Sequence, residues 1–217
     1  IYFKFTMKNL KILLIAAAIL FITQNFSFAQ SIKDSYEKGK KAFYSDDFET
    51  ANKLLSEILN MKDNDYEVCY YQGLIYFMYF DFDKAILSLT KSIELNDEFD
   101  KSYFNRGVIY ERKENIPFAI NDYTKAIKIN NNYADAYYNR ATLYQTSGNN
   151  DKAIKDYSHV IKMNPKDDIA YYNRGLLFEK TGQKEKAIRD FETAIKLDAI
   201  WKNELNKKIE EIKKSVK

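Results

Sequence analysis

Three segments of the sequence repeat side chains that could bind a ligand. An aromatic pair, an asparagine and an arginine stand at residues 103–106, 137–140 and 171–174, 34 residues apart each time. An asparagine amide can both donate hydrogen bonds to a peptide main chain and accept them from it. An arginine guanidinium can form two parallel hydrogen bonds with a carboxylate. The segments therefore suggest peptide binding or carboxylate binding, and the choice depends on the elements that carry them.

Groups that usually carry catalysis or bind metals are scarce. The chain of 217 residues contains one histidine, His159, and one cysteine, Cys69. A lone cysteine cannot form an internal disulfide, and the sequence has no phosphate-binding glycine loop and no HExxH or CxxC spacing. We expect His159 to be exposed and Cys69 to be buried as a small apolar residue. The sequence therefore predicts no catalytic residue, no cofactor and no metal site.

The first 29 residues differ in character from the rest of the chain. They carry three lysines and no acidic residue, and an unbroken apolar run occupies residues 12–22. At about 1.5 Å per helical residue this run reaches about 16 Å, whereas the hydrocarbon core of a bilayer is about 30 Å thick. A basic start, a short apolar centre and a small-x-small ending at residues 27–29 are typical of a secretory signal peptide. We predict a start at Met7 and cleavage after Ala29; an uncleaved membrane anchor is the alternative.

Removal of this segment changes the charge of the chain. The formal net charge is +3, and the three lysines of residues 1–29 account for all of it, so the remainder is close to neutral. A neutral chain offers no general electrostatic attraction to nucleic acid. We therefore expect no nucleic-acid partner and membrane contact only through the signal segment before cleavage. The expected location is the periplasm or the exterior of a bacterium.

The 34-residue interval extends over most of the chain. The sequence aligned with itself gives five ungapped copies, at residues 32–65, 66–99, 100–133, 134–167 and 168–201. We call a position within a copy a column. Column eight holds Gly39, Gly73, Gly107, Ala141 and Gly175, and column twenty holds Ala51, Ala85, Ala119, Ala153 and Ala187. Small residues at a fixed contact allow two helices to pack closely, with axes about 8–10 Å apart.

Each copy has the pattern of two helices joined by a short turn. In the fourth copy, apolar residues recur at helical spacing over residues 136–145 and again over 151–163. Gly148 lies between these segments and Gly182 lies at the same column of the fifth copy, where glycine favours a left-handed helix end. The other three copies carry a side chain at this column: Asp46, Phe80 and Glu114. We therefore expect the turn to tolerate side chains.

The repeat resembles the tetratricopeptide repeat, which has the same length. The resemblance covers residues 32–201 and implies an all-α fold, a right-handed α-α superhelix of five helix-turn-helix repeats whose first helices line a concave groove. The family's tryptophan column departs from the pattern, with Ser35, Cys69 and then tyrosine in the last three copies. The usual proline column has only Pro165.

Residues 202–217 follow the last copy. From the last residue of that copy onward, five apolar residues lie on one face of a helix: Trp201, Leu205, Ile209, Ile212 and Val216. We predict a helix that caps the exposed end of the array. A basic tail that binds acidic partners is the alternative, because the other faces are rich in lysine.

Arginine and aspartate occupy two further columns of the last three copies. Column seven and column twenty-three pair Arg106 with Asp122, Arg140 with Asp156 and Arg174 with Asp190, and the first two copies lack both residues. Because the two types occur together, we interpret them as ion pairs between helices, either within a copy or across neighbouring copies. Arginines that bind a ligand are the alternative.

The candidate ligand site combines two neighbouring columns of the first helix. Column five is aromatic in every copy: Tyr36, Tyr70, Phe104, Tyr138 and Tyr172. Column six is asparagine in the last three copies: Asn105, Asn139 and Asn173. In the resembled family, residues near these columns can face the groove, where a ladder of rings would suit an extended or helical peptide. The alternative is that the rings pack between adjacent first helices.

Two classes of function fit these observations. The first is an exported, non-catalytic module that binds a peptide or protein segment in its groove. The second is a structural scaffold subunit of a cell-envelope or secretion assembly, joined to it through the outer surface. An apolar groove with a charged convex face would favour the first, and an exposed apolar convex face would favour the second.

Overall fold

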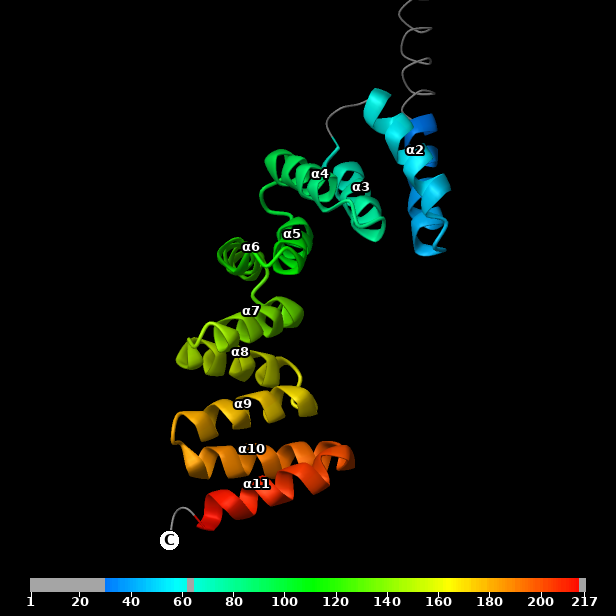
Figure 1. The fold of residues 1–217 in the computed structure, drawn as a ribbon. Helices are drawn as coiled ribbons and strands as arrows, with labels where there is room; N and C mark the ends of the chain where they lie inside the picture. The colour runs from blue at the N-terminus through cyan, green and yellow to red at the C-terminus, as the bar shows by residue number, and fades with distance from the viewer. Residues whose placement is uncertain (1–29, 62–64, 215–217) are drawn as a thin grey trace, which may run out of the picture. The chain divides into compact units, whose positions relative to one another are not determined.

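The structure is a computed structural model that describes residues 30–61 and 65–214. Every regular element within these residues is a helix, and no strand occurs among them (Figure 1). The prediction of an all-α helical-repeat fold is therefore confirmed. The predicted signal peptide at residues 1–29, including Met7 and the cleavage site after Ala29, lies outside the described residues.

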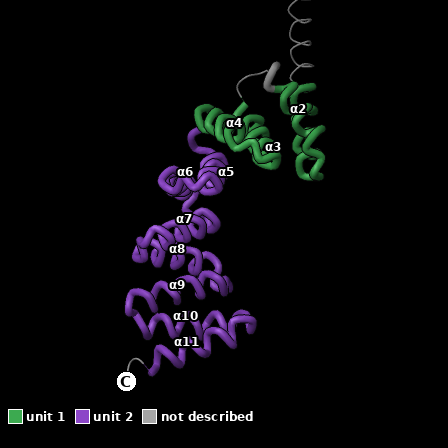
Figure 2. Tube along the Cα trace, in the orientation of Figure 1, with its two compact units in different colours: residues 1–95 green, residues 96–217 purple. Residues whose placement is uncertain are grey.

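The chain forms two compact units that divide between Leu95 and Asn96 (Figure 2). The first unit contains a helix at residues 30–44, α2 (Phe48–Met61), α3 (Tyr66–Met78) and α4 (Phe82–Leu95). α3 packs against both α2 and α4. Six apolar side chains from α2, α3 and α4 have no exposed surface in this unit: Ala51, Leu55, Val68, Ile75, Ala85 and Leu89.

The second unit continues the pattern of paired helices. Its first helices are α5 (Asp100–Arg112), α7 (Ala134–Thr146) and α9 (Asp168–Lys180), and its second helices are α6 (Ile116–Ile129), α8 (Asn150–Met163) and α10 (Lys184–Leu197). A 3-10 turn, η1 (Ala199–Trp201), leads into α11 (Lys202–Lys214). Each second helix packs against the first helix of its own copy and against the next one along the chain. Pro117 lies in the first turn of α6, where its missing N–H removes no helical hydrogen bond.

Small residues lie at the contact between the two helices of each copy and allow them to pack closely. The alanines of column twenty have no exposed surface: Ala51, Ala85, Ala119, Ala153 and Ala187. A methyl group on Gly107 would lie 2.9 Å from Cε1 of Tyr123, and one on Gly175 would lie 2.6 Å from Cε1 of Phe191. The large ring at column twenty-four thus fills the space beside the small residue of column eight, and we expect a residue larger than alanine there to force the helices apart.

The turns between paired helices share one backbone conformation. Gly148 and Gly182 have φ of 75°, and the other copies reach φ of 58–60° with a side chain in place: Asp46, Phe80 and Glu114. In the fourth copy the amide of Gly148 donates to the carbonyl of Gln145, and the amide of Asn149 donates to the carbonyl of Tyr144. These bonds satisfy carbonyls at the helix end. In three of the turns, a residue other than glycine therefore adopts the left-handed conformation.

The apolar face of α11 covers the end of the second unit. Leu205, Ile209 and Ile212 are at most 5% exposed and pack with residues of α9 and α10, including Phe178 and Phe191. These three residues stand 34 positions after the residues of columns four, eight and eleven in the fifth copy. α11 is therefore in register as the first helix of a sixth copy. The predicted fifth member of its face, Val216, lies outside the described residues.

Candidate binding surface

The arginine and aspartate columns meet as ion pairs between the first and second helix of one copy. Arg140 on α7 donates from Nε to Oδ2 of Asp156 on α8 and from Nη2 to Oδ1, both at 2.8 Å. The Asp156 side chain is only 6% exposed. The other copies of the second unit repeat the geometry in two pairs, Arg106 with Asp122 and Arg174 with Asp190. This bidentate arrangement supports the ion-pair interpretation.

The same guanidinium groups connect neighbouring copies. Arg140 Nη1 donates to Oγ1 of Thr124 on α6 at 2.9 Å, and Arg174 Nη1 donates to Oγ of Ser158 on α8 at 3.0 Å. Each of these arginines thus bonds through three nitrogens to the protein itself. Their role is to join helices, and the arrangement does not favour the alternative of ligand binding.

Two aromatic rings enclose the Arg140 guanidinium. Its central carbon lies 5.6 Å from the ring centroid of Tyr137 and 5.8 Å from that of Tyr144. Burial lowers the pKa of Arg140, but the hydrogen bonds and the charge of Asp156 raise it by more, so its pKa is above the usual value. The rings of columns four and eleven therefore lie on either side of the guanidinium and stabilise its charged form.

The asparagines of column six lie on the first helices of the second unit. Asn173 Nδ2 donates to the Tyr138 hydroxyl at 3.0 Å, and Asn139 Nδ2 donates to the Tyr123 hydroxyl at 3.3 Å. Asn105 donates instead to the carbonyl four residues earlier in α5. Within the described residues, Asn139 and Asn173 each keep one N–H and the amide oxygen without a bond. An amide in this state can still pair with the main chain of a peptide.

The aromatic residues of column five are half-buried and reach the following first helix. Phe104 stacks on Tyr133 with ring centroids 4.7 Å apart, and Tyr172 stacks on Trp201 at 4.3 Å. The Tyr138 hydroxyl accepts the bond from the asparagine of α9. These contacts are those that the packing alternative expects. Part of each ring nevertheless stays at the surface, so the rings form a partly exposed row along the second unit.

The first unit contributes two rings of column five. The Tyr36 hydroxyl donates to Oε2 of Glu67 at 2.5 Å, and Tyr70 meets the edge of Tyr71 at 5.2 Å. Burial and the bond to Glu67 raise the pKa of Tyr36. The hydroxyl therefore stays protonated and serves as a donor between neighbouring first helices.

A second set of tyrosines, at column twenty-four, is buried beneath this surface and was not anticipated from columns five and six. The Tyr157 hydroxyl donates to Oε1 of Gln145 and lies 3.2 Å from Thr142 Oγ1. Tyr123 donates to Oε2 of Glu111 at 2.6 Å. Burial raises the pKa of Tyr157 to about 12. The signal in the sequence is an acceptor at column twelve wherever column twenty-four is tyrosine.

The fifth copy shows what happens when that tyrosine is absent. Phe191 occupies column twenty-four and has no hydroxyl, and Glu179 at column twelve accepts from Lys208 of α11 at 2.9 Å. Glu179, which has no tyrosine hydroxyl to accept from, thus pairs with the capping helix α11. Trp201 and Tyr133, the stacking partners of column five, were also missed, although their aromatic character at column thirty-four is visible in the sequence.

The lone residues with reactive side chains are placed as expected. His159 is exposed and stacks on Tyr137 at 4.8 Å, and Cys69 is 2% exposed. Within the described residues, no group of three or more His, Cys, Asp or Glu side chains could hold a metal ion. Among the helices of residues 30–61 and 65–214, none combines the length and apolar character that crossing a membrane requires.

Antiparallel helix pairs stacked in register define the class of helical-repeat proteins. Comparison with known proteins narrows the class. Residues 134–167 and 169–199 match the family model described as tetratricopeptide repeat, and residues 112–148 match the model described as TPR repeat. Together these models cover residues 112–167 and 169–199, so this part of the chain consists of tetratricopeptide repeats, and proteins with such repeats are generally non-catalytic modules for protein–protein interaction. No curated protein sequence matches the chain.

Solved structures agree with this assignment. The crystal structure of MamA protein is 27% identical, covers 79% of this chain and 93% of its own, and superposes with a TM-score of 0.70. YrrB, a TPR protein with an unusual peptide-binding site, is 18% identical, with 83% and 97% covered and a TM-score of 0.69. A tetratricopeptide repeat protein from Parabacteroides merdae is 22% identical, with 79% and 70% covered and a TM-score of 0.68. The last two show similarity of fold alone.

Proposed function

We propose that this chain is a non-catalytic binding module that holds a peptide or protein segment along its first helices. The observation that carries the proposal is the row of half-buried rings Phe104, Tyr138 and Tyr172, interleaved with the amides of Asn139 and Asn173. Rings offer apolar contact at low entropic cost, and amides can bond the main chain of a bound segment. The internal contacts of the row fix its geometry before a partner arrives, which reduces the cost of binding.

The partner is expected to be recognised by main chain and apolar side chains more than by charge. The polar groups on the same helices carry both signs, and Glu179 is already paired with Lys208. Peptide binding is named for YrrB, which shares this fold, and that likeness supports the general mode of binding. A segment without strong net charge should therefore bind best.

The test uses the only tryptophan of the chain. Trp201 stacks on Tyr172, so a segment that contacts this ring should change the tryptophan emission. Partners captured from bacterial envelope extract would be identified, and the contacted segment synthesised and titrated. We expect Tyr138→Ala with Tyr172→Ala to weaken binding by about tenfold or more.

Two further variants control that experiment. Asn139→Ala removes an amide at the surface and leaves the ring packing in place, so it should weaken binding while lowering the free energy of unfolding by no more than about 1 kcal/mol, the value of its bond to Tyr123. Tyr79→Ala lies in the turn of the first unit, where the side chain is 55% exposed, and should have no effect. Undiminished affinity in both the double tyrosine variant and Asn139→Ala would contradict the proposal.

A scaffold subunit remains the second candidate because of one observation in the first unit. The turn between α3 and α4 exposes Met78, Tyr79 and Phe80 by 48%, 55% and 80%. Consecutive exposed apolar side chains at a turn are typical of a contact site for another molecule. If Phe80→Ser releases the chain from an envelope complex and the groove variants do not, the scaffold function is the correct one.

Export of the chain is a proposal that rests on the composition of residues 1–29. The basic start and short apolar run support a cleaved signal segment and a periplasmic or secreted location. Mass measurement of the protein recovered from a bacterial host would test it. The expected mature chain begins at Gln30, and a full-length chain recovered with the membrane fraction would favour an anchor.

A further inference from the structure

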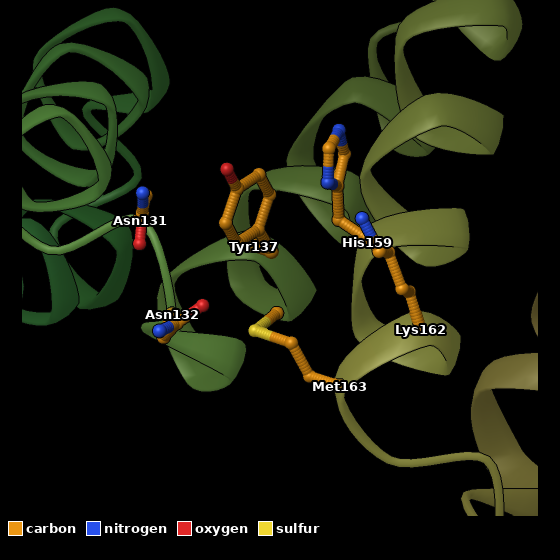
Figure 3. Close-up of a pocket in the computed structure, with 6 residues that line it drawn as sticks. All are labelled: Asn131, Asn132, Tyr137, His159, Lys162 and Met163. Carbon is orange, nitrogen blue, oxygen red and sulfur yellow. The ribbon is translucent and has the colours of Figure 1, made fainter.

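A pocket of about 630 Å³ lies away from the rings and amides of the first-helix surface. Its wall comes from the loop before α7 and from the last turns of α8 (Figure 3). The lining residues are Asn131, Asn132, Tyr137, His159, Lys162 and Met163. Figure 3 shows the Tyr137 ring between Asn131 and the parallel ring of His159, with the Lys162 side chain running along the same wall. Pockets of this volume can hold a small molecule.

Hydrogen-bond donors in this pocket are unused. Within the described residues, the side chains of Asn131, Asn132, His159 and Lys162 form no hydrogen bond or ion pair, and neither does the Tyr137 hydroxyl. An ammonium, an imidazole, a phenol and two amides all offer donors, and only one of the five carries a fixed charge, which is positive. No carboxylate lines the pocket. The pocket is therefore suited to an acceptor-rich, negatively charged group.

An equivalent pocket in the preceding copy has different charges. It has a volume of about 450 Å³ and uses the same columns, with Tyr103 in place of Tyr137. Asp97 and Glu98 replace the two asparagines, and Lys125 and Lys128 replace His159 and Lys162: the lining is Asp97, Glu98, Tyr103, Lys125, Lys128 and Ile129. Two carboxylates balance the two lysines, so this pocket has no net charge to attract an anion.

We propose that the pocket of the fourth copy binds a small anionic ligand through its carboxylate or phosphate groups. The Lys162 ammonium and the His159 imidazole bond the anion from α8, and the amides of Asn131 and Asn132 bond it from the opposite side. The Tyr137 ring stands between these two sets of donors, and its hydroxyl adds a further donor (Figure 3). This site is independent of the proposed peptide surface, which uses columns five and six.

His159 makes the proposal directly testable, because it is the only histidine in the chain. Its imidazole C–H signals in a proton NMR spectrum of the untagged protein need no further assignment. Inorganic phosphate and citrate are titrated separately at one fixed pH, with sodium chloride at equal ionic strength as the reference. A saturable shift with phosphate alone identifies phosphate chemistry, and a saturable shift with citrate alone identifies carboxylate chemistry. Both results support the site.

Matched variants decide whether the pocket is the cause. Lys162→Ala should weaken the saturable binding by about tenfold or more, because a charged hydrogen bond is lost. Asn131→Asp with Asn132→Glu gives the pocket the carboxylates of its neighbour and should abolish binding. Lys128→Ala, in the neighbouring pocket, should leave it unchanged. A shift that never saturates and equals that of sodium chloride overturns the proposal, and so does unchanged affinity in Lys162→Ala.

Discussion

Gln72 in the first unit and Arg140 in the second occupy the same column of their copies. Gln72 Nε2 donates to Oγ of Ser56 at 2.8 Å, and Arg140 Nη1 donates to Oγ1 of Thr124 at 2.9 Å. Ser56 and Thr124 share column twenty-five of the preceding copy, so both units make the bond between copies. Only the second unit adds the bond within a copy, because Ser88 stands in the first unit where Asp156 stands in the fourth copy.

The difference also changes the surface beside these columns. In the first unit a surface pocket of about 290 Å³ is lined by residues that include Cys69, Gln72, Ser88 and the exposed Leu87. The second unit places tyrosine, arginine and aspartate at the same columns, and a guanidinium between two rings occupies that kind of space. The helical hairpin therefore forms without the ion pair. The small residues already allow the two helices to pack, and the ion pair adds hydrogen bonds and ring contacts between them.

The largest expected effect comes from removing one partner of a buried pair. Arg140→Ala leaves Asp156 buried without its counter-ion, and we expect a loss of about 3 kcal/mol in the free energy of unfolding. Gln72→Ala removes a single neutral bond and should cost only about 1 kcal/mol. Denaturant unfolding, with hydrogen exchange to localise the change to α7 and α8, measures both.

The double variant tests whether Arg140 and Asp156 act as one unit. Arg140→Ala with Asp156→Ala should cost less than the sum of the single changes, because no buried charge is left unpaired. If the losses in the free energy of unfolding were additive, the ion pair would not contribute to stability, and the two units would not differ in this respect.

The close contact between the two helices of a copy, at column eight, offers a second comparison between the units. A methyl group on Gly175 would lie 2.6 Å from the rigid ring of Phe191, whereas one on Gly39 would meet the flexible Leu55 side chain at 3.1 Å. We expect Gly175→Ala to cost about 1–3 kcal/mol through overpacking. Gly39→Ala should be close to neutral, because the gain in helix propensity of about 1 kcal/mol offsets the tighter contact. Thermal unfolding measures both, and equal losses would contradict the distinction.

The turns provide a smaller effect of opposite sign in the two units. Phe80 adopts φ of 60° with a side chain, and Gly148 adopts φ of 75° with open space around it. Phe80→Gly should stabilise the first unit by up to about 1 kcal/mol by relieving the left-handed strain. Gly148→Ala should destabilise the second by about 1 kcal/mol. Loss of stability in Phe80→Gly would show that the exposed ring packs usefully within the chain.

The smallest effect at neutral pH concerns the buried tyrosine of α8. Burial raises the pKa of Tyr157 to about 12, above the ordinary value near 10, so the folded state holds this proton more tightly than the unfolded chain. Its contribution to stability is complete below about pH 10 and is lost as the pH rises toward 12. Helical circular dichroism against pH should show a shallower alkaline loss in Tyr157→Phe. An identical profile in the variant would mean that other groups control the transition.

The sequence predicted the features that depend on one copy alone. The glycine and alanine seam, the two helices, and the arginine–aspartate pairing all follow from residue types at fixed columns, because the partners lie within one hairpin. The left-handed turn at Phe80 was also foreseeable, since glycine stands at its column elsewhere.

Of the features that join two copies, the sequence predicted the capping helix and offered ring packing between first helices as an alternative, but it did not predict the individual contacts. Tyr172 stacks on Trp201, and Arg140 reaches Thr124, because successive hairpins are rotated and translated by amounts that column patterns do not contain. The same holds for the pocket beside Tyr137, whose wall combines a loop and two helices. Its equivalence with the pocket beside Tyr103 becomes visible only when both are placed in space.

The register of α11 has a consequence for how long this array can become. Ile209 stands at column eight, where the earlier copies offer glycine or alanine to the incoming helix. A further helix docked there would contact the branched side chain of Ile209, which is already buried. We therefore expect that an engineered second helix after α11 would pack better with a residue smaller than Ile209 at this column.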